Sequence, residues 1–190
     1  SIPVWAEETG TGEGVETGVT YVAEVNGSQY KTLEEAIEAG SEITLLNNVE
    51  LTNCITIGKD ITLNLGEYTL SIVGTNHDSP VLYITAGNVV IEGGKVVTTG
   101  SGIALRVVGG EVTLNEVDVI GATYGILLQN EAVLNVNEGS EVFSPNTPNA
   151  FESGDGIRAY NSATVNVNGG TVCGLNTTDY SAGVELYNTA

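Results

Sequence analysis

The amino-acid sequence predicts an all-β fold, a three-sided parallel β-solenoid, from three observations. The segment 134–137 and its near copy 165–168 each follow another apolar alternation, at Ile126 and Ile157, by eight residues. Short apolar alternations recur along the chain every 22 to 31 residues, with three of them in each repeat. Glycines fall at matching places between the alternations. One turn of a three-sided solenoid has this length and this number of strands.

The composition fits one domain with an aliphatic core. A chain of 190 residues is long enough to bury a sizeable core. Apolar residues make up 41% of the chain, which contains no Met, one Trp and two Phe, so Val, Ile, Leu and Ala must fill the interior. Val and Ile suit narrow, layered strands.

The first 19 residues are expected to lie outside the folded domain. Residues 1–6 end in the small-residue pattern of a signal-peptide cleavage site and are interpreted as the remnant of a signal peptide. Residues 7–19 are acidic and rich in glycine, which favours a flexible linker. The solenoid is therefore predicted over residues 20–190, with an N-terminal cap at 21–40 and coils at 43–190.

The N-terminal cap is predicted to be a hairpin followed by a short helix. Asn26 and Gly27 favour a tight hairpin turn with positive φ. Thr32 and Glu35 form a capping box, in which the Thr32 hydroxyl accepts a hydrogen bond from the Glu35 amide. The helix is predicted over residues 32–39. Because two helical turns are unstable alone, the apolar face of this helix is expected to cover the open end of the stacked strands.

The coils are predicted from three series of apolar segments. The first series begins at Val81, Ile103, Ile126, Ile157 and Val184. The second series begins at Val89, Val112, Leu134 and Val165. A weaker third series contains Val96, Val117, Val119, Val142 and Val172. Equivalent strands are expected to pair in parallel between coils, with their apolar side chains inside and Thr, Asn and Glu outside.

Glycine and asparagine are predicted to form the corners of the coils. Only a residue without a Cβ suits a sharp corner with positive φ. The corner glycines are Gly93, Gly94, Gly109, Gly110, Gly139, Gly169 and Gly170. Asn130, Asn161 and Asn188 each lie four residues after a coil start. Their amides are expected to hydrogen-bond to one another as a structural ladder.

The charge of the chain excludes several partners. The net charge is -19, because five Lys and Arg stand against 24 Asp and Glu. Nucleic acids and anionic membranes need clustered basic residues and are not expected to bind. No apolar stretch approaches the ~20 residues of a membrane helix, so no membrane insertion is expected. No cofactor is predicted, although this acidity leaves weak Ca²⁺ binding open.

The two cysteines are expected to be free, mostly buried thiols. Several layers of about 4.8 Å would separate Cys54 from Cys173, whereas a disulfide needs Cα atoms within roughly 7 Å. No CxxC motif or Cys/His cluster is present, and no metal ligand is predicted.

The start of the domain resembles a known family. The pattern consists of Val-Ala-Glu-Val-Asn-Gly at 22–27, then Tyr30, Thr32-Leu33 and Glu35-Ala36-Ile37. It resembles the pectate-lyase-like, adhesin-type parallel β-helix domains of Gram-positive bacterial surface proteins, over residues 21–190. The resemblance implies a right-handed parallel β-helix with an N-terminal helical cap. It implies no catalytic set, because this fold hosts lyases, hydrolases, adhesins and spacers.

A polysaccharide lyase or glycoside hydrolase is the alternative function. Its candidate catalytic residues are Asp118, Asp155 and Arg158, with Glu116, Glu152, His77 and Asp78 as further members. Asp118 and Arg158 are expected to point outward, and Arg158 is expected to form a surface ion pair with Asp155 or Glu185. No motif assigns roles to these residues, so none is assigned as catalytic. A polyanionic substrate would be repelled by the acidic chain.

A non-catalytic surface module, adhesin-like or a rigid spacer, is the preferred function. It would bind glycans or host surface proteins, and four tyrosines offer stacking surfaces: Tyr83, Tyr124, Tyr160 and Tyr187. Tyr83 shares the phase of the buried residues and is expected in the core; no binding residue is assigned. The chain ends as a new coil begins, so a fragment of a longer protein is expected, with the rest of that chain as a neighbour. Secretion to a bacterial cell surface is the expected localisation.

Overall fold

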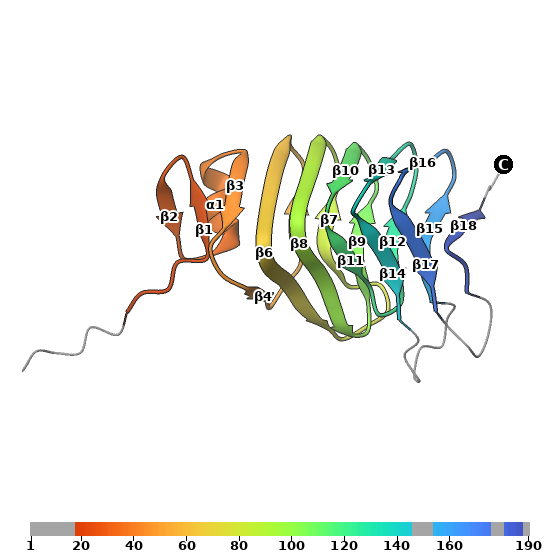
Figure 1. Cartoon of the computed structure of the whole chain (residues 1–190), viewed down its shortest axis with the longest axis horizontal. Helices are drawn as coiled ribbons and strands as arrows, with labels where there is room; N and C mark the ends of the chain where they lie inside the picture. Colours follow the sequence, from red (N-terminus) through yellow and green to blue (C-terminus); the bar gives the residue numbers. More distant parts are fainter. Residues whose placement is uncertain (1–17, 146–153, 176–180, 188–190) are drawn as a thin grey trace, which may run out of the picture.

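The computed structural model describes residues 18–145, 154–175 and 181–187, which form strands and one short helix in two sheets (Figure 1). The predicted signal-peptide remnant and nearly all of the predicted linker lie outside the described residues. The strands lie side by side along the long axis of the molecule, from β2 and β1 at one end to β18 at the other (Figure 1). The fold is therefore all-β, as predicted.

The larger sheet contains twelve strands and the smaller sheet six. The path of the larger sheet is β16 (Thr164–Asn168), β13 (Val133–Asn137), β10 (Glu111–Asn115), β8 (Asn88–Gly100), β6 (Ile61–Gly74), β3 (Glu42–Leu45), β1 (Ala23–Val25) and β2 (Ser28–Tyr30). Its other members are β4 (Val49–Leu51), β11 (Asp118–Ile120), β14 (Glu141–Ser144) and β17 (Thr171–Gly174). The smaller sheet runs β18 (Val184–Tyr187), β15 (Asp155–Tyr160), β12 (Tyr124–Leu128), β9 (Ile103–Val107), β7 (Pro80–Ile84) and β5 (Ile55–Ile57).

Strands of successive repeats pair in parallel, as the spacing of the apolar segments predicts. Among the described strands only β1 pairs antiparallel, with β2 and β3. Three consecutive repeats each place one strand in the smaller sheet and two in the larger: β9–β11, β12–β14 and β15–β17. The second predicted series is in register throughout, because Val112 pairs with Val89 and with Leu134, which pairs with Val165.

In the first predicted series, the first two members, Val81 and Ile103, are not in register with the later ones. Ile126 pairs with Leu105 rather than Ile103, and Leu105 pairs with Leu82 rather than Val81. Because side chains alternate between the faces of a strand, the shift of one residue at Val81 reverses the phase of β7. Tyr83 therefore lies half-buried on the outer face, and the prediction that it belongs to the core is wrong.

The core consists of aliphatic side chains, as the composition predicts. Val112, Leu114, Leu134 and Val136 are fully buried between the sheets. At about 25 cal/mol per Å² of apolar surface removed from water, each such side chain stabilises the fold by roughly 1.5–3 kcal/mol. A second, smaller cluster contains Ile103, Tyr124 and Leu127, on the outer side of the smaller sheet.

Helix α1 (Leu33–Ala39) is formed as its capping box predicts. The Thr32 hydroxyl accepts a hydrogen bond of 3.2 Å from the Glu35 amide. Leu33 and Ala36 are fully buried and join the main core. Lys59 donates from Nζ to the carbonyl oxygens of Ile37 and Gly40, which stabilises the C-terminal end of the helix. The helix lies beside β1 and β3, at the N-terminal end of the stack (Figure 1).

The last described repeat is more exposed than the repeats before it. Val167 is 47% exposed, although its register partner Val136 is fully buried. Leu186 is 69% exposed, although its register partner Ala159 is 3% exposed. Within the described residues, β16, β17 and β18 each pair with a strand on one side only. A comparison of substitutions at Val136 and Val167 therefore tests how much burial at each position stabilises the fold.

Asparagine ladders form at other positions than predicted. The side chain of Asn137 accepts from that of Asn168 at 3.2 Å and donates to that of Asn115 at 2.8 Å. Asn130 instead has a φ of 60° and donates to the backbone carbonyl of Val108 at 3.1 Å. Asn161 likewise has a φ of 61°, and Asn188 lies outside the described residues. The predicted ladder is therefore wrong for Asn130, whose amide stabilises a corner by bonding to backbone.

Five of the seven predicted corner glycines have a positive φ, whereas Gly109 and Gly170 do not. Gly93 has a φ of 67° and Gly110 a φ of 80°, in the region that glycine adopts most readily. A Cβ on Gly110 would lie 2.4 Å from the carbonyl oxygen of Gly87, so adjacent layers approach too closely for any side chain there. The two cysteines are free, as predicted, but Cys54 is exposed rather than buried, and Cys173 is half-buried.

Candidate functional site

The structure separates Asp118 from the other two candidate catalytic residues. Asp118 lies on β11 of the larger sheet, whereas Asp155 and Arg158 lie on β15 of the smaller sheet. Asp118 points outward, as predicted, and forms an ion pair of 2.6 Å with Lys95 from the preceding layer. This ion pair raises the pKa of Lys95 above its usual value. Asp118 is therefore part of an exposed cross-strand pair.

The substitution Asp118→Asn is expected to reduce the free energy of unfolding by less than about 1 kcal/mol, because solvent screens a pair in which Lys95 is 52% exposed. Urea unfolding at low and high salt measures this effect, and the difference from wild type should shrink at high salt. A loss of several kcal/mol, unchanged by salt, would contradict the assignment of Asp118 to a surface pair.

Asp155 and Arg158 come together with Glu185, as predicted. Arg158 Nη2 lies 2.7 Å from Asp155 Oδ2 and 2.9 Å from Glu185 Oε2. Arg158 Nη1 donates to the Tyr124 hydroxyl at 2.6 Å, and the guanidinium carbon lies 4.2 Å from the centre of the Tyr124 ring. The prediction of a surface ion pair is wrong, because Arg158 is 8% exposed and Asp155 is 1% exposed.

Parallel register brings these side chains into one cluster. Arg158 pairs with Glu185 on β18 and with Leu127 on β12. Asp155, three residues before Arg158, pairs with Tyr124. The sequence shows the partners of Arg158, but not its burial, because burial depends on residues such as Tyr124 that lie one layer away.

The environment of the cluster shifts the pKa values of its two carboxyl groups in opposite directions. Burial raises the pKa of Asp155, which the backbone amide of Ala182 and the Arg158 guanidinium only partly oppose. Burial acts to raise the pKa of Glu185 as well, but hydrogen bonds from Asp155, Tyr187 and Arg158 outweigh it and lower that pKa. The pKa of Arg158 is raised by its Tyr124 and Asp155 partners, so it stays charged. The cluster is therefore a network of one guanidinium and two carboxyl groups, in which Asp155 is buried and Glu185 is partly exposed.

Planar side chains lie in two adjacent columns on the outer face of the smaller sheet, because Tyr160 and Tyr187 pair two residues further along the strands than the column of Tyr83 and Arg106. This tyrosine–arginine strip consists of Tyr83, Arg106, Gln129, Tyr160 and Tyr187. The Arg106 guanidinium carbon lies 5.7 Å from the centre of the Tyr83 ring. Arg106 Nε and Nη2 both donate to Gln129 Oε1, at 3.2 and 3.0 Å. The rings of Tyr160 and Tyr187 are stacked, with centres 4.9 Å apart.

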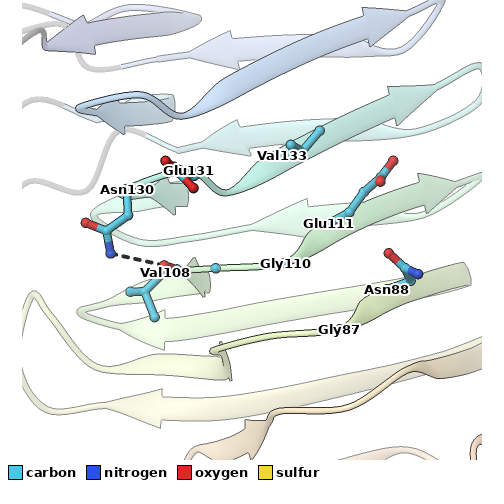
Figure 2. Close-up of a pocket in the computed structure, with 9 residues that line it drawn as sticks. Gly87, Asn88, Val108, Gly110, Glu111, Asn130, Glu131 and Val133 are labelled. Carbon is cyan, nitrogen blue, oxygen red and sulfur yellow. Dashed lines mark hydrogen bonds between the residues drawn. The ribbon is translucent and has the colours of Figure 1, made fainter.

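A shallow groove lies at the corner that follows this face. Its volume is about 690 Å³, and its lining includes Asn88, Glu111, Asn130 and Glu131 together with corner glycines. Figure 2 shows Asn130 and Glu131 from one layer above Gly110, and Asn88 from the layer below. Asn130 directly follows Gln129, so the groove begins where the tyrosine–arginine strip ends. The sequence did not reveal this groove, because it depends on the parallel stacking of three corners.

The remaining candidate residues are not gathered into a site. His77 and Asp78 are more than half exposed and lie 3.5 Å apart in the turn after β6. Glu116 has a φ of 52° at a corner, and Glu152 lies outside the described residues. In the described parts of the chain, no group of three or more His, Cys, Asp or Glu is arranged to hold a metal ion.

Comparisons with family models, with curated proteins and with solved structures find no match for this chain. None of the helices in the described residues is long and apolar enough to cross a membrane.

Proposed function

We propose that this chain is a non-catalytic binding module of a bacterial cell surface, adhesin-like, folded as a right-handed parallel β-helix with three strands per coil. The parallel pairing of equivalent strands in three consecutive repeats supports the coiled architecture. The resemblance of residues 22–37 to surface adhesin domains supports the cellular setting and export. In this proposal the ligand is a glycan, and a host surface protein that carries glycans is the natural partner.

The tyrosine–arginine strip is the observation that carries the proposed function. It gathers three of the eight tyrosines and one of the five basic residues on one outer face. Tyrosine combines an apolar ring with a hydroxyl that hydrogen-bonds, so it packs against the apolar face of a sugar and contacts its hydroxyl groups. Neighbouring strands are about 4.8 Å apart, so the Tyr83–Arg106 pair and the stacked Tyr160 and Tyr187 offer two sets of planar groups on one face to an extended ligand.

The geometry of the candidate catalytic residues favours binding over turnover. Asp118 is paired with Lys95, and Asp155 is nearly inaccessible to solvent. A glycosidase needs two carboxyls that reach opposite sides of a glycosidic bond. Asp155 and Glu185 instead both accept hydrogen bonds from Arg158. A turnover assay on polysaccharides tests the alternative function, which is a lyase or a glycoside hydrolase.

The substitution Tyr160→Ala is expected to weaken glycan binding by roughly tenfold, because it removes one of the two stacked rings of the strip. A glycan array run with the immobilised chain identifies a ligand, and titration of that glycan into each variant measures the affinity. Tyr21→Ala is the matched control, since Tyr21 is an exposed tyrosine outside the strip. Equal losses in the two variants, or no glycan bound by the wild type, would overturn the proposed function.

A further inference from the structure

Arg106 differs from the other four basic residues in its surroundings. Arg158 pairs with Asp155 and Glu185, and Lys95 pairs with Asp118. Lys59 contacts the carbonyl oxygens at the end of α1 and is exposed, as is Lys31. Arg106 is half-buried, and no carboxylate of the described residues pairs with it, although the chain carries 24 acidic residues. A cation held on an outer face without an acidic partner is available to an external anion.

The orientation of Arg106 is fixed by neutral partners. Tyr83 lies under the guanidinium, at 5.7 Å from ring centre to guanidinium carbon. Gln129 Oε1 accepts from Nε and Nη2, which form one edge of the guanidinium. The other edge, formed by Nη1 and Nη2, carries two parallel N–H groups. These two N–H groups match the two oxygens of a carboxylate.

We propose that Arg106 binds the carboxylate of an acidic sugar in a glycan that lies along the tyrosine–arginine strip. This inference rests on the proposed function, and it adds that the bound glycan carries a negative charge. A carboxylate accepts two N–H bonds from the open edge of the guanidinium, while Tyr83 and Gln129 hold that guanidinium in place. Binding therefore needs little ordering of the Arg106 side chain.

The net charge of the chain selects a ligand with a single carboxylate. A protein of net charge -19 repels polyanions, and the repulsion grows with each charge on the ligand. One carboxylate among neutral sugars gains a charge-assisted pair with Arg106 and adds the least repulsion. The stacked Tyr160 and Tyr187 begin two strands away from Arg106 and two residues further along the strand, which is a separation of about 12 Å. A short oligosaccharide with one acidic sugar spans that interval, with its neutral sugars at the tyrosines.

The experiment compares acidic and neutral forms of the same glycan. The probes are lactose carrying a terminal N-acetylneuraminic acid, lactose carrying a glucuronic acid, and unmodified lactose, each titrated into the full chain by calorimetry. The acidic forms are expected to bind about 10- to 100-fold more tightly than lactose. A short peptide with a free C-terminal carboxylate, and the same peptide as its amide, test whether a protein carboxylate is the preferred source.

Substitutions at Arg106 test its role directly. Arg106→Gln is expected to remove the preference for the acidic forms, and Arg106→Lys to restore only part of it, since lysine keeps the charge but lacks the planar edge. Lys31→Gln is the control of equal charge change at an exposed position. Circular dichroism and thermal unfolding confirm that each variant is folded before titration.

The outcomes separate this inference from the proposed function. Equal binding of acidic and neutral glycans would overturn the role of Arg106 and leave the binding module intact. Equal losses in Arg106→Gln and Lys31→Gln would also overturn it, because a general charge effect would then explain the preference. Tighter binding of the peptide with a free carboxylate than of both acidic sugars would overturn the proposal that the carboxylate bound by Arg106 belongs to a glycan. Binding of none of the probes and of no glycan on the array would overturn both.

Discussion

The substitution Val136→Asp is expected to unfold the protein. Val136 is fully buried in the main core, on β13 between the strands β10 and β16. A carboxylate there would have no cation or hydrogen-bond donor among its aliphatic neighbours, and burying an unpaired charge is among the most destabilising changes known. The expected loss exceeds about 4 kcal/mol, which is most of the stability of an ordinary domain. Far-UV circular dichroism and urea unfolding measure it.

The chain offers a matched control for this substitution. Val167 is the register partner of Val136 on the next strand, has the same inward phase, and is 47% exposed. Val167→Asp is expected to change the free energy of unfolding by less than about 1 kcal/mol, because the carboxylate stays hydrated. Soluble, cooperatively folded Val136→Asp protein would contradict the inward phase of β13. A Val167→Asp variant as unstable as Val136→Asp would show that this end of the stack is covered in solution.

The substitution Arg158→Ala is expected to reduce the free energy of unfolding by about 3–5 kcal/mol at neutral pH. It removes the cation that contacts both Asp155 and Glu185, so the buried Asp155 carboxyl and the partly exposed Glu185 carboxyl lose their shared partner. It also removes the guanidinium that packs on Tyr124. Urea unfolding at pH 7 measures the loss, and Arg106→Ala, two strands away in the same column, is the comparison without a carboxylate partner.

The deficit of Arg158→Ala is expected to shrink as the pH falls. The lowered pKa of Glu185 contributes stability that is present above the ordinary glutamate pKa of 4.5 and is lost as the pH falls through the folded-state pKa. The raised pKa of Asp155 acts with the opposite sign, because its contribution is full below the ordinary aspartate pKa of 3.8 and is lost as the pH rises through the folded-state pKa. In the acidic range both carboxyls are protonated and need no cation. A deficit that stays constant from pH 7 to the acidic range would contradict the role of Arg158 as the cation that stabilises these two carboxylates.

The sequence was sufficient for the elements whose determinants are local. The capping box at Thr32 and Glu35 depends on residues three apart, and α1 begins as predicted. The period-two alternation at Leu134 and Val136 defines an inward face directly, and both side chains are fully buried. The partner of Arg158 was also predictable, because Glu185 occupies the equivalent place in the next repeat.

The features that the sequence did not predict correctly depend on how successive layers stack on one another. The phase of Tyr83 depends on whether Leu82 or Val81 stacks on Leu105, and repeats of unequal length leave that choice open. The burial of Arg158 depends on Tyr124, 34 residues away along the chain. The groove at Asn130 depends on how three corners superpose. None of these arrangements has a signature in a single stretch of residues.

The most direct test of the central claim measures binding and turnover on the same panel of polysaccharides. The full chain is screened on a glycan array with and without Ca²⁺, and the same glycans are assayed for new reducing ends and for unsaturated products. Binding without either product is the predicted result. Turnover that is lost in Asp155→Asn but kept in Asp118→Asn would contradict the non-catalytic assignment and make the Asp155–Arg158–Glu185 cluster an active site.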